Sequence, residues 1–322
     1  MGVVVVGSYV QDHAWLCDRF PDTGETVSAT GFNTGPGGKG FNQAIASHRL
    51  GAPTVFIGAL GDDALAAAAR AFAAANGVVC RWQTCATAPT ASSSIIVDAQ
   101  GDNRIVVNLA ANEALSPEFV RANGDAFAAR RVLLTQLETG LEAVRAALQL
   151  AREHGLRRIL NPAPVPAAFD PAILRDCDLI TPNETEFALL LKLCVGSIID
   201  GAAVAGLDDE MLDAQCRALG VATVVVTLGS QGCFVSHAAD ASLVAGDVRR
   251  FYRVTPERVN AIDTTGAGDA FSGALAAALA TAPQAPFHAL VTLANRAAAL
   301  STETIGTAPA MPTPAAIAKR FR

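Results

Sequence analysis

The chain has 322 residues, of which 51% are hydrophobic and only 17% are charged, a composition too apolar for a disordered protein. Its formal net charge of −6 provides no basic excess with which to bind nucleic acid through the phosphates. No run of about 20 apolar residues is present, so the sequence predicts neither a transmembrane helix nor a membrane partner.

The amino terminus begins with an expected core strand at Val3–Val6, which ends at the turn Gly7-Ser8. A signal peptide would need a cationic start and a longer apolar run. The seven cysteines are scattered and form no Cys-x-x-Cys pair, which argues against a zinc site and against a disulfide framework. We therefore expect reduced, mostly buried thiols in a cytoplasmic protein.

Short β-branched runs alternate with longer helical patterns along the chain. The expected strands are Val3–Val6, Val55–Gly58, Val132–Leu134, Arg158–Leu160, Leu179–Thr181 and Thr223–Thr227. The expected helices are Phe41–Leu50, Ala64–Asn76, Leu141–His154 and Met211–Leu219, followed by glycines suited to left-handed caps at Gly51, Gly77, Gly155 and Gly220. This alternation predicts an α/β fold with a mostly parallel sheet and helices on both faces, where ligands bind beyond the carboxyl ends of the strands.

Two segments interrupt the alternation of strands and helices. Thr23–Asn33 is polar and β-branched, and Ser92–Val107 is typical of a hairpin around Asp98–Asp102. Neither segment is followed by a helix, so we interpret them as a small accessory sheet, a lid inserted at about residues 8–35 and 90–108. The alternative is a pair of ordinary surface hairpins.

The stretch Asp263–Gly273 (DTTGAGDAFSG) carries the most chemical information. The small residues Gly266, Ala267 and Gly268 let backbone N–H groups converge at the start of a helix, which favours a phosphoryl group. Asp269 follows in the first helical turn, where a carboxylate can accept a proton from an attacking hydroxyl while the amides stabilise the transferring phosphate. The alternative is a favourable first-turn charge beside an ordinary glycine turn.

The stretch Gly35–Ala44 (GPGGKGFNQA) has the glycines of a phosphate-binding loop, but Gly40 stands where a Walker A loop requires Ser or Thr. The glycines instead indicate a backbone that closely approaches a bound polyol. Asn42 can both donate to and accept from the hydroxyls of such a ligand. Lys39 is a mobile positive charge, and the alternative for it is a solvated lysine at a loop tip.

Three further pieces fit a nucleotide. Asn183 and Glu186 follow an expected strand and share a helix face, where they either organise a hydrated magnesium or cap the helix. The stretch Thr227–Gly232 can wrap phosphates or ribose, although taken singly it is only a glycine-bearing turn. Glu138 comes just after the strand at Val132–Leu134, at the ligand-facing end of the sheet.

Together these pieces resemble the ribokinase-like (phosphofructokinase-B type) carbohydrate kinases. The resemblance implies one domain over residues 1–322, a three-layer αβα sandwich with a Rossmann-like central sheet and a small β-sheet lid that also supports a homodimer. The motifs match in order over nearly the whole chain: Gly7-Ser8 with Asp12, Gly37-Gly38-Lys39-Gly40 with Asn42, Asn161-Pro162-Ala163-Pro164, Asn183 with Glu186, Thr227–Gly232 and Asp263–Asp269.

The resemblance also implies roles for individual residues. Asp269 would be the catalytic base, and Gly266, Ala267 and Gly268 would form the anion hole for the γ-phosphate. The substrate-binding residues would be Asp12, Gly38, Lys39, Asn42, Glu138 and Asp269, and the nucleotide-binding residues Asn183, Thr227, Gly229, Ser230, Gly232, Gly268 and Asn295, the last near the adenine. Magnesium would be organised through water by Asn183 and Glu186, and a monovalent cation, usually potassium, by Asp263, Thr265, Ser301, Thr304 and Gly306.

Within the family, Gly24-Glu25-Thr26 and Ala110-Ala111-Asn112 resemble the members that phosphorylate ribose. The implied reaction is transfer of the γ-phosphate of ATP to the primary hydroxyl of a small sugar, with conversion of D-ribose to D-ribose 5-phosphate as the leading candidate. The alternatives are a nucleoside kinase or another sugar kinase of the same fold and, from another class, a non-catalytic sugar- or nucleotide-binding regulator.

The chain departs from the pattern of those members at Val10, where they carry Asn two residues before the sugar-binding Asp12. A valine cannot make the hydrogen bonds of the amide, and a sugar hydroxyl left unpaired on burial costs about 1–3 kcal/mol. Either the sugar differs, or Gln11, Tyr9 or His13 compensates.

Overall fold

The computed structural model describes residues 2–247 and 249–321. Its large sheet has nine strands in the order β13-β12-β11-β10-β9-β8-β1-β4-β5. The strands are β1 (Val3–Val6), β4 (Thr54–Leu60), β5 (Val79–Thr84), β8 (Val132–Thr135), β9 (Arg157–Leu160), β10 (Leu179–Ile180), β11 (Thr223–Thr227), β12 (Cys233–His237) and β13 (Phe251–Val254). Within this sheet β12 pairs antiparallel with both neighbours and every other pairing is parallel, which confirms the predicted mostly parallel sheet.

Helices cover both faces of the large sheet. They are α1 (Lys39–Arg49), α2 (Ala64–Ala75), α3 (Pro117–Ala122), α4 (Leu141–Glu153), α5 (Glu184–Val195), α6 (Gly201–Val204), α7 (Asp209–Ala218), α8 (Ala267–Thr281), α9 (Phe287–Ser301) and α10 (Pro314–Arg320). The side chains of β1 alternate between two hydrophobic cores, one shared with α1, α2, α8 and α9 and the other with α4, α5 and α7. The predicted three-layer αβα arrangement is confirmed.

The predicted helix ends are close to the observed ones. Gly51, Gly77, Gly155 and Gly220 follow α1, α2, α4 and α7 with φ angles of 90°, 70°, 68° and 72°, the left-handed conformation expected of glycine caps. Within residues 2–247 and 249–321, no helix is both long and apolar enough to cross a membrane.

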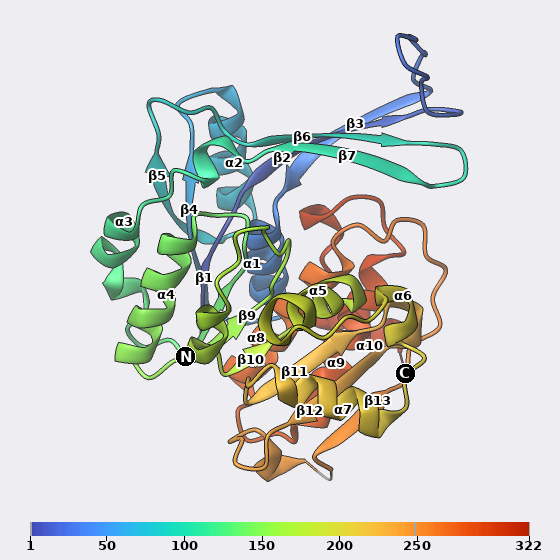
Figure 1. Cartoon of the computed structure of the whole chain (residues 1–322). Helices are drawn as coiled ribbons and strands as arrows, with labels where there is room; N and C mark the ends of the chain where they lie inside the picture. The colour runs from blue at the N-terminus through green and yellow to red at the C-terminus, as the bar shows by residue number, and fades with distance from the viewer. Residues whose placement is uncertain (1, 248, 322) are drawn as a thin grey trace.

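A second sheet of four strands, ordered β3-β2-β6-β7, projects from the body in Figure 1. Its strands are β2 (Val10–Leu16), β3 (Gly31–Gly37), β6 (Ser92–Val97) and β7 (Asn103–Asn108). The antiparallel pair β6–β7 confirms the predicted hairpin.

The expectation of a strand over Thr23–Asn33 is wrong, because most of it is an irregular loop and β3 begins only at Gly31. In this loop Glu25 accepts hydrogen bonds from the Arg19 guanidinium and from the Asp22 N–H. Such local bonds from side chains compete with strand pairing.

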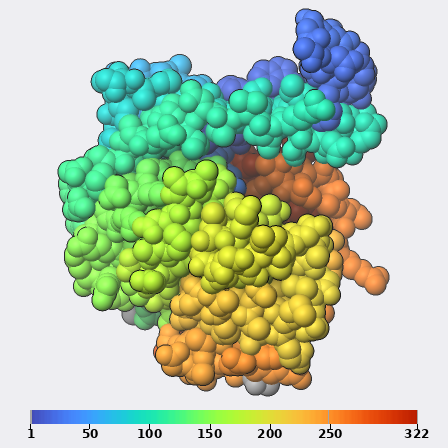
Figure 2. All heavy atoms as spheres, viewed as in Figure 1, coloured from blue at the N-terminus to red at the C-terminus, as the bar shows by residue number. Residues whose placement is uncertain are grey.

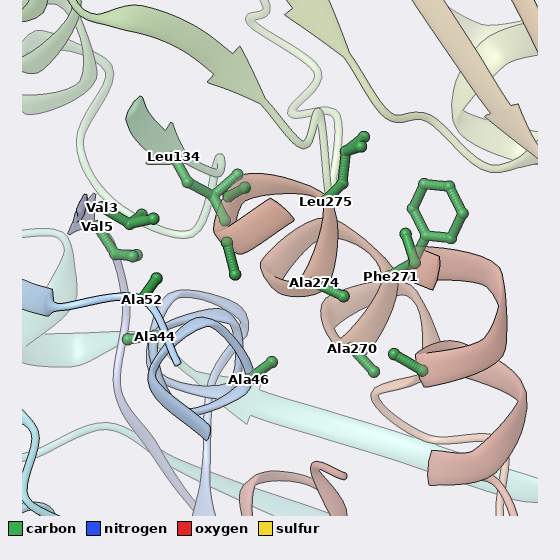
Figure 3. Close-up of a cluster of buried hydrophobic side chains, with 14 of the residues drawn as sticks. Val3, Val5, Ala44, Ala46, Ala52, Leu134, Ala270, Phe271, Ala274 and Leu275 are labelled. Carbon is green, nitrogen blue, oxygen red and sulfur yellow. The ribbon is translucent and has the colours of Figure 1, made fainter. Parts of the chain in front are cut away.

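Close packing of α1 against α8 positions the functional residues on both helices. Figure 3 shows Ala46 on the side of α1 that faces Ala270 and Ala274 of α8. A Cβ added at Gly273 would lie 2.6 Å from Ala46 Cβ, so only glycine permits this approach. The contact brings residues early in the chain beside the start of α8, more than 200 residues later.

Candidate active site

The candidate site lies at the carboxyl ends of the parallel strands, under the second sheet. Ser8 follows β1, Glu138 follows β8 and Asn183 follows β10, so all three extend from the same edge of the large sheet. Figure 2 shows a hollow between the teal strands β6 and β7 and the yellow residues of α5.

The carboxylate of Asp269 lies in the first turn of α8 and is only 6% exposed. Its Oδ2 accepts a hydrogen bond from Asn42 Nδ2 at 2.9 Å, and its Oδ1 accepts one from Gln43 Nε2 at 2.9 Å. Gln43 is itself held by two further amides, since its Nε2 donates to Asn161 Oδ1 and its Oε1 accepts from Gln136 Nε2. Fixed donors on both oxygens give the carboxylate a defined orientation.

Burial makes Asp269 more basic than an ordinary aspartate. It raises the pKa of this carboxyl, although the positive charge of Lys39 and the two amide donors act in the opposite direction. A raised pKa suits a general base. The buried Oδ1 of Asn42 has no hydrogen-bond partner among the described residues, so it can accept a bond from a ligand hydroxyl beside Asp269.

The start of α8 offers backbone donors to an anion. Gly266 caps the helix with a φ of 79°, a left-handed conformation that favours glycine. Ala267 donates its N–H to the Thr264 carbonyl at 3.2 Å. Across the described parts of the chain, no group accepts the N–H of Gly266, Gly268 or Asp269, so these three donors are available.

Lys39 begins α1, and the charges of three carboxylates act on its ammonium. Burial lowers the pKa of Lys39, but the charges of Asp269, Glu138 and Glu186 together outweigh burial and raise it. The side chain therefore keeps its positive charge. It is only partly exposed, which argues against the alternative of a solvated lysine.

Asp12 reaches the same space from β2. Its Oδ1 accepts a hydrogen bond from Ser93 Oγ at 2.6 Å, and its Oδ2 accepts one from Thr307 Oγ1 at 3.4 Å. Burial, with the negative charges of Glu138 and Asp269, raises the pKa of Asp12 to about 6, although the two hydroxyl donors lower it. At neutral pH this carboxylate is ionised and is a strong acceptor for sugar hydroxyls.

Glu138 ties three segments together. Its Oε2 accepts hydrogen bonds from Ser8 Oγ at 2.6 Å and from the Lys39 N–H at 2.9 Å.

Gly38, which precedes α1, has a φ of 87°, and a Cβ there would lie 2.6 Å from the Val10 amide nitrogen. Packing of this loop on β2 therefore already requires glycine at position 38.

The residues considered as substitutes for an asparagine at Val10 are all engaged elsewhere. The Tyr9 hydroxyl donates to Gln11 Oε1 at 2.7 Å, and Gln11 Nε2 and His13 Nδ1 contact the same threonine hydroxyl of β3 at 2.9 and 3.1 Å. Side chains alternate along a strand, so Gln11 and His13 lie on the face opposite Asp12. None of the three compensates for Val10, which shares the face of Asp12.

Asn183 and Glu186 form a capping box at the start of α5, the alternative weighed for them above. Asn183 Oδ1 accepts from the Glu186 N–H at 2.8 Å, and Glu186 Oε2 accepts from the Asn183 N–H at 2.9 Å. Burial raises the pKa of Glu186. Its Oε1 accepts no hydrogen bond from any described residue, which leaves one carboxylate oxygen for a hydrated cation.

The turn after β11 lies beside this capping box, because Asn183 and Thr227 form an isolated parallel bridge. Gly229 and Gly232 have φ angles of 51° and 83°, so both suit glycine. A Cβ at Gly232 would lie 2.1 Å from the carbonyl oxygen that ends β13. Ser230 is exposed on the turn.

Asn295 lies in α9 and is 8% exposed. Its Nδ2 donates to the Thr255 carbonyl at 3.0 Å. Thr255 directly follows β13, the strand on which Gly232 packs. Asn295 thus fixes the segment after β13, which lies beside the turn Thr227–Gly232. Its contact with an adenine stays a prediction.

Two of the residues expected to hold a monovalent cation with Asp263, Thr265 and Gly306, contact its carboxylate. Its Oδ1 accepts from the Thr265 N–H and its Oδ2 from the Gly306 N–H, both at 2.9 Å. The carbonyl of Ser301 already accepts the Thr304 N–H at 3.3 Å. The loop before α8 and the loop after α9 are therefore joined through one carboxylate.

Four contacts of the site were not predicted from the sequence. Gln43 and Ser8 belong to motifs named in the sequence analysis. Their positions next to Asn42 and Gly7 could have indicated that they lie in the site. Ser93 and Thr307 bond Asp12 from segments 81 and 295 residues away, and neither carries a local pattern that indicates it.

Comparisons with known proteins agree with one another. The model of the pfkB family of carbohydrate kinases matches residues 2–314. A ribokinase of Haemophilus influenzae is 34% identical over 312 residues, covering 97% of this chain and 95% of that protein. A deoxyribokinase of Salmonella typhi is 32% identical over 282 residues, covering 86% and 85%. The structure of Arabidopsis thaliana ribokinase complexed with ribose and ATP matches with a TM-score of 0.79 at 27% identity, covering 100% of this chain and 98% of that one.

Proposed function

Because the chain belongs to the pfkB family of carbohydrate kinases, we propose that it transfers the γ-phosphate of ATP to the primary hydroxyl of D-ribose. Membership of this family makes it a phosphotransferase with an alcohol acceptor. The observation that carries the proposal is the start of α8, where the buried carboxylate of Asp269 adjoins three free amides. The relative named ribokinase and the neighbour solved with ribose and ATP support this acceptor and donor.

In the proposed reaction, Asp269 accepts the proton of the sugar hydroxyl as that oxygen attacks the γ-phosphorus, and the bond from this phosphorus to the bridging oxygen breaks to release ADP. Its raised pKa increases its basicity, and its bonds to Asn42 and Gln43 fix its orientation. The free amides of Gly266 and Gly268 donate to the oxygens of the transferring phosphate. Catalysis then rests on positioning and charge stabilisation, because phosphoryl transfer requires little covalent participation of the protein.

We place the sugar between Asp12, Asn42 and Asp269. Asp12 is an ionised acceptor at neutral pH, and Asn42 offers a buried carbonyl oxygen with no partner in the described structure. Gly38, Lys39 and Glu138 complete the substrate side as predicted contacts. The nucleotide is assigned to the turn with Thr227, Gly229, Ser230 and Gly232 and to the segment after β13 that Asn295 fixes.

Magnesium fits this site when it is bound through water. In the described structure no three His, Cys, Asp or Glu residues lie close enough to ligate a metal directly, whereas Glu186 keeps one free carboxylate oxygen. The charge of Lys39 is already offset by three carboxylates that raise its pKa, so a triphosphate needs additional positive charge nearby. When bound, magnesium would neutralise the phosphate oxygens. Asn183 and Glu186 would hold its waters.

A monovalent cation, probed first as potassium, is assigned to the loops joined by Asp263. That carboxylate supplies negative charge, and the carbonyls of Thr304 and Gly306 lie in the same loop. Thr265 and Ser301 complete the assigned set. The cation would lie next to the amides at the start of α8 and would strengthen their attraction for the phosphate.

A second acceptor, a deoxy sugar, is favoured by one observation. Val10 is buried on the face of Asp12, and the three described candidates to replace the missing amide all bond elsewhere. An apolar wall at this point suits a sugar that lacks a hydroxyl there. The relative named deoxyribokinase, 32% identical to this chain, supports this second acceptor.

The remaining parts of the proposal concern location and assembly. We expect a cytoplasmic enzyme, because all seven cysteines are free in the structure. We also expect a homodimer formed through the second sheet, the lid of the sequence analysis, whose outer surface carries exposed apolar side chains such as Phe32 and Val106.

The proposal is tested by measuring ADP formation with a panel of acceptors: D-ribose, 2-deoxy-D-ribose, D-fructose and adenosine. We expect ribose to give the highest kcat/KM, with deoxyribose within about tenfold because Val10 discriminates weakly. Each reaction is run with and without magnesium and potassium.

Two outcomes would contradict the ribose assignment. A preference for adenosine would make the chain a nucleoside kinase. ATP consumption that no acceptor stimulates, together with measurable sugar binding, would instead support the non-catalytic regulator.

A further inference from the structure

A cavity of about 350 Å³ opens at the opposite edge of the large sheet from the candidate active site. It is lined by Val132 at the start of β8, Arg157 at the start of β9 and Asp178 just before β10. Since these strands are parallel, all three mark the amino-terminal edge of the sheet, whereas Glu138 and Asn183 lie at the carboxyl edge. The cavity is therefore a separate site.

Three arginines without partners surround this cavity. Arg130, Arg131 and Arg157 all line it, and within residues 2–247 and 249–321 their guanidinium groups make no hydrogen bond or ion pair. The Nε of Arg130 is buried and unpaired. Burial also lowers the pKa of Arg157, although the negative charge of Asp178 acts in the opposite direction. A buried donor without an acceptor is unfavourable by about 1–3 kcal/mol, and more when it is charged.

The acidic charge in the described lining of the cavity is too small to neutralise these three arginines. Asp178 is the one acidic side chain among the described lining residues. Its carboxylate is already bonded by Arg158, through Nε at 3.0 Å, through Nη2 at 2.6 Å and through the backbone N–H at 2.8 Å. The cavity thus has an excess of positive charge, although the chain as a whole carries −6.

The backbone that positions Arg130 and Arg131 includes a strained residue. Ala129 has a φ of 59°, a left-handed conformation that an alanine rarely adopts. Arg131 is then anchored by its N–H to the Gly2 carbonyl at 2.9 Å and by its own carbonyl to the Arg157 N–H at 2.8 Å. A strained residue persists where the surroundings fix it, and here it precedes Arg130 and Arg131.

The lining of the cavity also includes four apolar residues, Val132, Leu156, Leu279 and Pro283. Guanidinium groups bind phosphate oxygens through paired N–H donors, and a cavity of this size holds a small organic molecule. From the unpaired arginines and the apolar residues that line it together, we propose that this cavity binds a phosphate group, either as the free ion or as the end of a small organic phosphate.

The test is calorimetric titration of inorganic phosphate and, separately, of phenyl phosphate into the full chain held with saturating ADP, which occupies the nucleotide site. We expect both ligands to bind. The double variant Arg131→Gln/Arg157→Gln should raise the Kd for phosphate by about tenfold or more, since it removes two charged donors. Tighter binding of phenyl phosphate would identify an organic phosphate that contacts the apolar lining residues, and equal affinities would identify the free ion.

The matched control is Arg152→Gln/Arg175→Gln, which removes the same charge from two exposed arginines outside the cavity and should leave the Kd unchanged. If the first variant does not fold, Arg131→Lys/Arg157→Lys keeps the charge and should still weaken binding several-fold, because lysine lacks the planar fork. Absence of binding by the parent, or equal Kd values in parent and cavity variant, would overturn the proposal. Because the readout is binding at the far edge of the sheet, it is independent of which sugar is phosphorylated.

Discussion

The catalytic role of Asp269 can be tested by replacing one carboxylate oxygen with an amide nitrogen, which leaves the rest of the site unchanged in shape. In Asp269→Asn, the amide keeps the shape of the side chain but loses the basic oxygen. We expect kcat to fall by about 10²–10⁴-fold, because proton acceptance is lost, while the Kd for ATP changes little. Either Asn42 or Gln43 would then face an NH₂ group, so the thermal midpoint should be measured alongside.

The control for this variant is Glu142→Gln, which changes an exposed first-turn carboxylate of α4 in the same way. It should leave both kcat and ATP affinity unchanged. If Asp269→Asn turned over sugar at a near-parent rate, Asp269 would be no more than a favourable first-turn charge.

Asp12 makes stability depend on pH in a direction that follows from its raised pKa. Its pKa is about 6 in the folded chain against 3.8 in the unfolded chain, so the folded state binds a proton more tightly. The stabilisation by this proton is complete below pH 3.8 and is lost as the pH rises through about 6. At neutral pH the ionised carboxylate of Asp12 therefore destabilises the fold. The same charge provides the acceptor for hydroxyls in the proposed sugar site.

We predict that Asp12→Asn raises the thermal midpoint by about 2–4 °C at pH 7.5 and that this gain disappears near pH 4. The same variant should raise the KM for the sugar. For the parent, KM should fall as the pH rises through about 6, as Asp12 ionises. Thermal unfolding and initial rates over pH 4–8 measure both effects, and an equally large midpoint difference at pH 4 and 7.5 would exclude this role of the Asp12 charge.

At the scale of elements, the contact between α1 and α8 couples packing to the site. We predict that Gly273→Ala destabilises the fold by about 1–3 kcal/mol, because its Cβ would meet Ala46 Cβ and the Gln43 carbonyl oxygen at 2.6 Å. Displacement of α1 would also move Gln43 away from Asp269 and lower kcat. Gly124→Ala is the control, since the nearest atom to its added Cβ is a Leu150 methyl at 3.7 Å. Equal thermal midpoints and kcat values in the two variants would show that α1 accommodates the added methyl group without displacing the residues of the site.

The elements that the sequence predicted best were those decided by local chemistry. The valines of β1, the alternating strands and the glycine caps each depend on a few neighbouring residues. The strand β2 was not predicted, because VQDHAWL shows no regular alternation, and it forms only by pairing with β3 and β6. Conversely, Thr23–Asn33 has strand-like residues, but its local side-chain bonds favour a loop.

The candidate site shows the same division. The glycine-rich start of α8 and the presence of Asp269 could be predicted, because a helix start creates free amides from sequence alone. The partners of Asp269 on α1 could not, since they depend on how two helices 227 residues apart pack. The burial that raises the pKa of Asp12 is likewise a property of the assembled fold.

For the molecule as a whole, the strand register divides the second sheet into two functional faces. Residues paired across neighbouring strands have side chains on the same face of the sheet. Asp12, Ser93 and Val107 therefore share one face. The opposite face carries His13, Ser94 and Val106. Asp12 marks the face over the sugar site. The opposite face carries Val106, which is 74% exposed, and the two faces are therefore suited to different partners, a substrate below and another protein surface above.

The outer face supports the proposed homodimer, and one valine tests it. We predict that Val106→Lys weakens the dimer by about tenfold or more, because a lysine ammonium would be buried in an apolar contact. Sedimentation velocity over a range of concentrations measures the dissociation constant. Val195→Lys adds the same charge at an exposed valine that ends α5, on the body of the molecule, and should leave the dimer intact. A parent that sediments as a monomer at every concentration, or a Val106→Lys dimer as tight as the parent, would exclude assembly through this face.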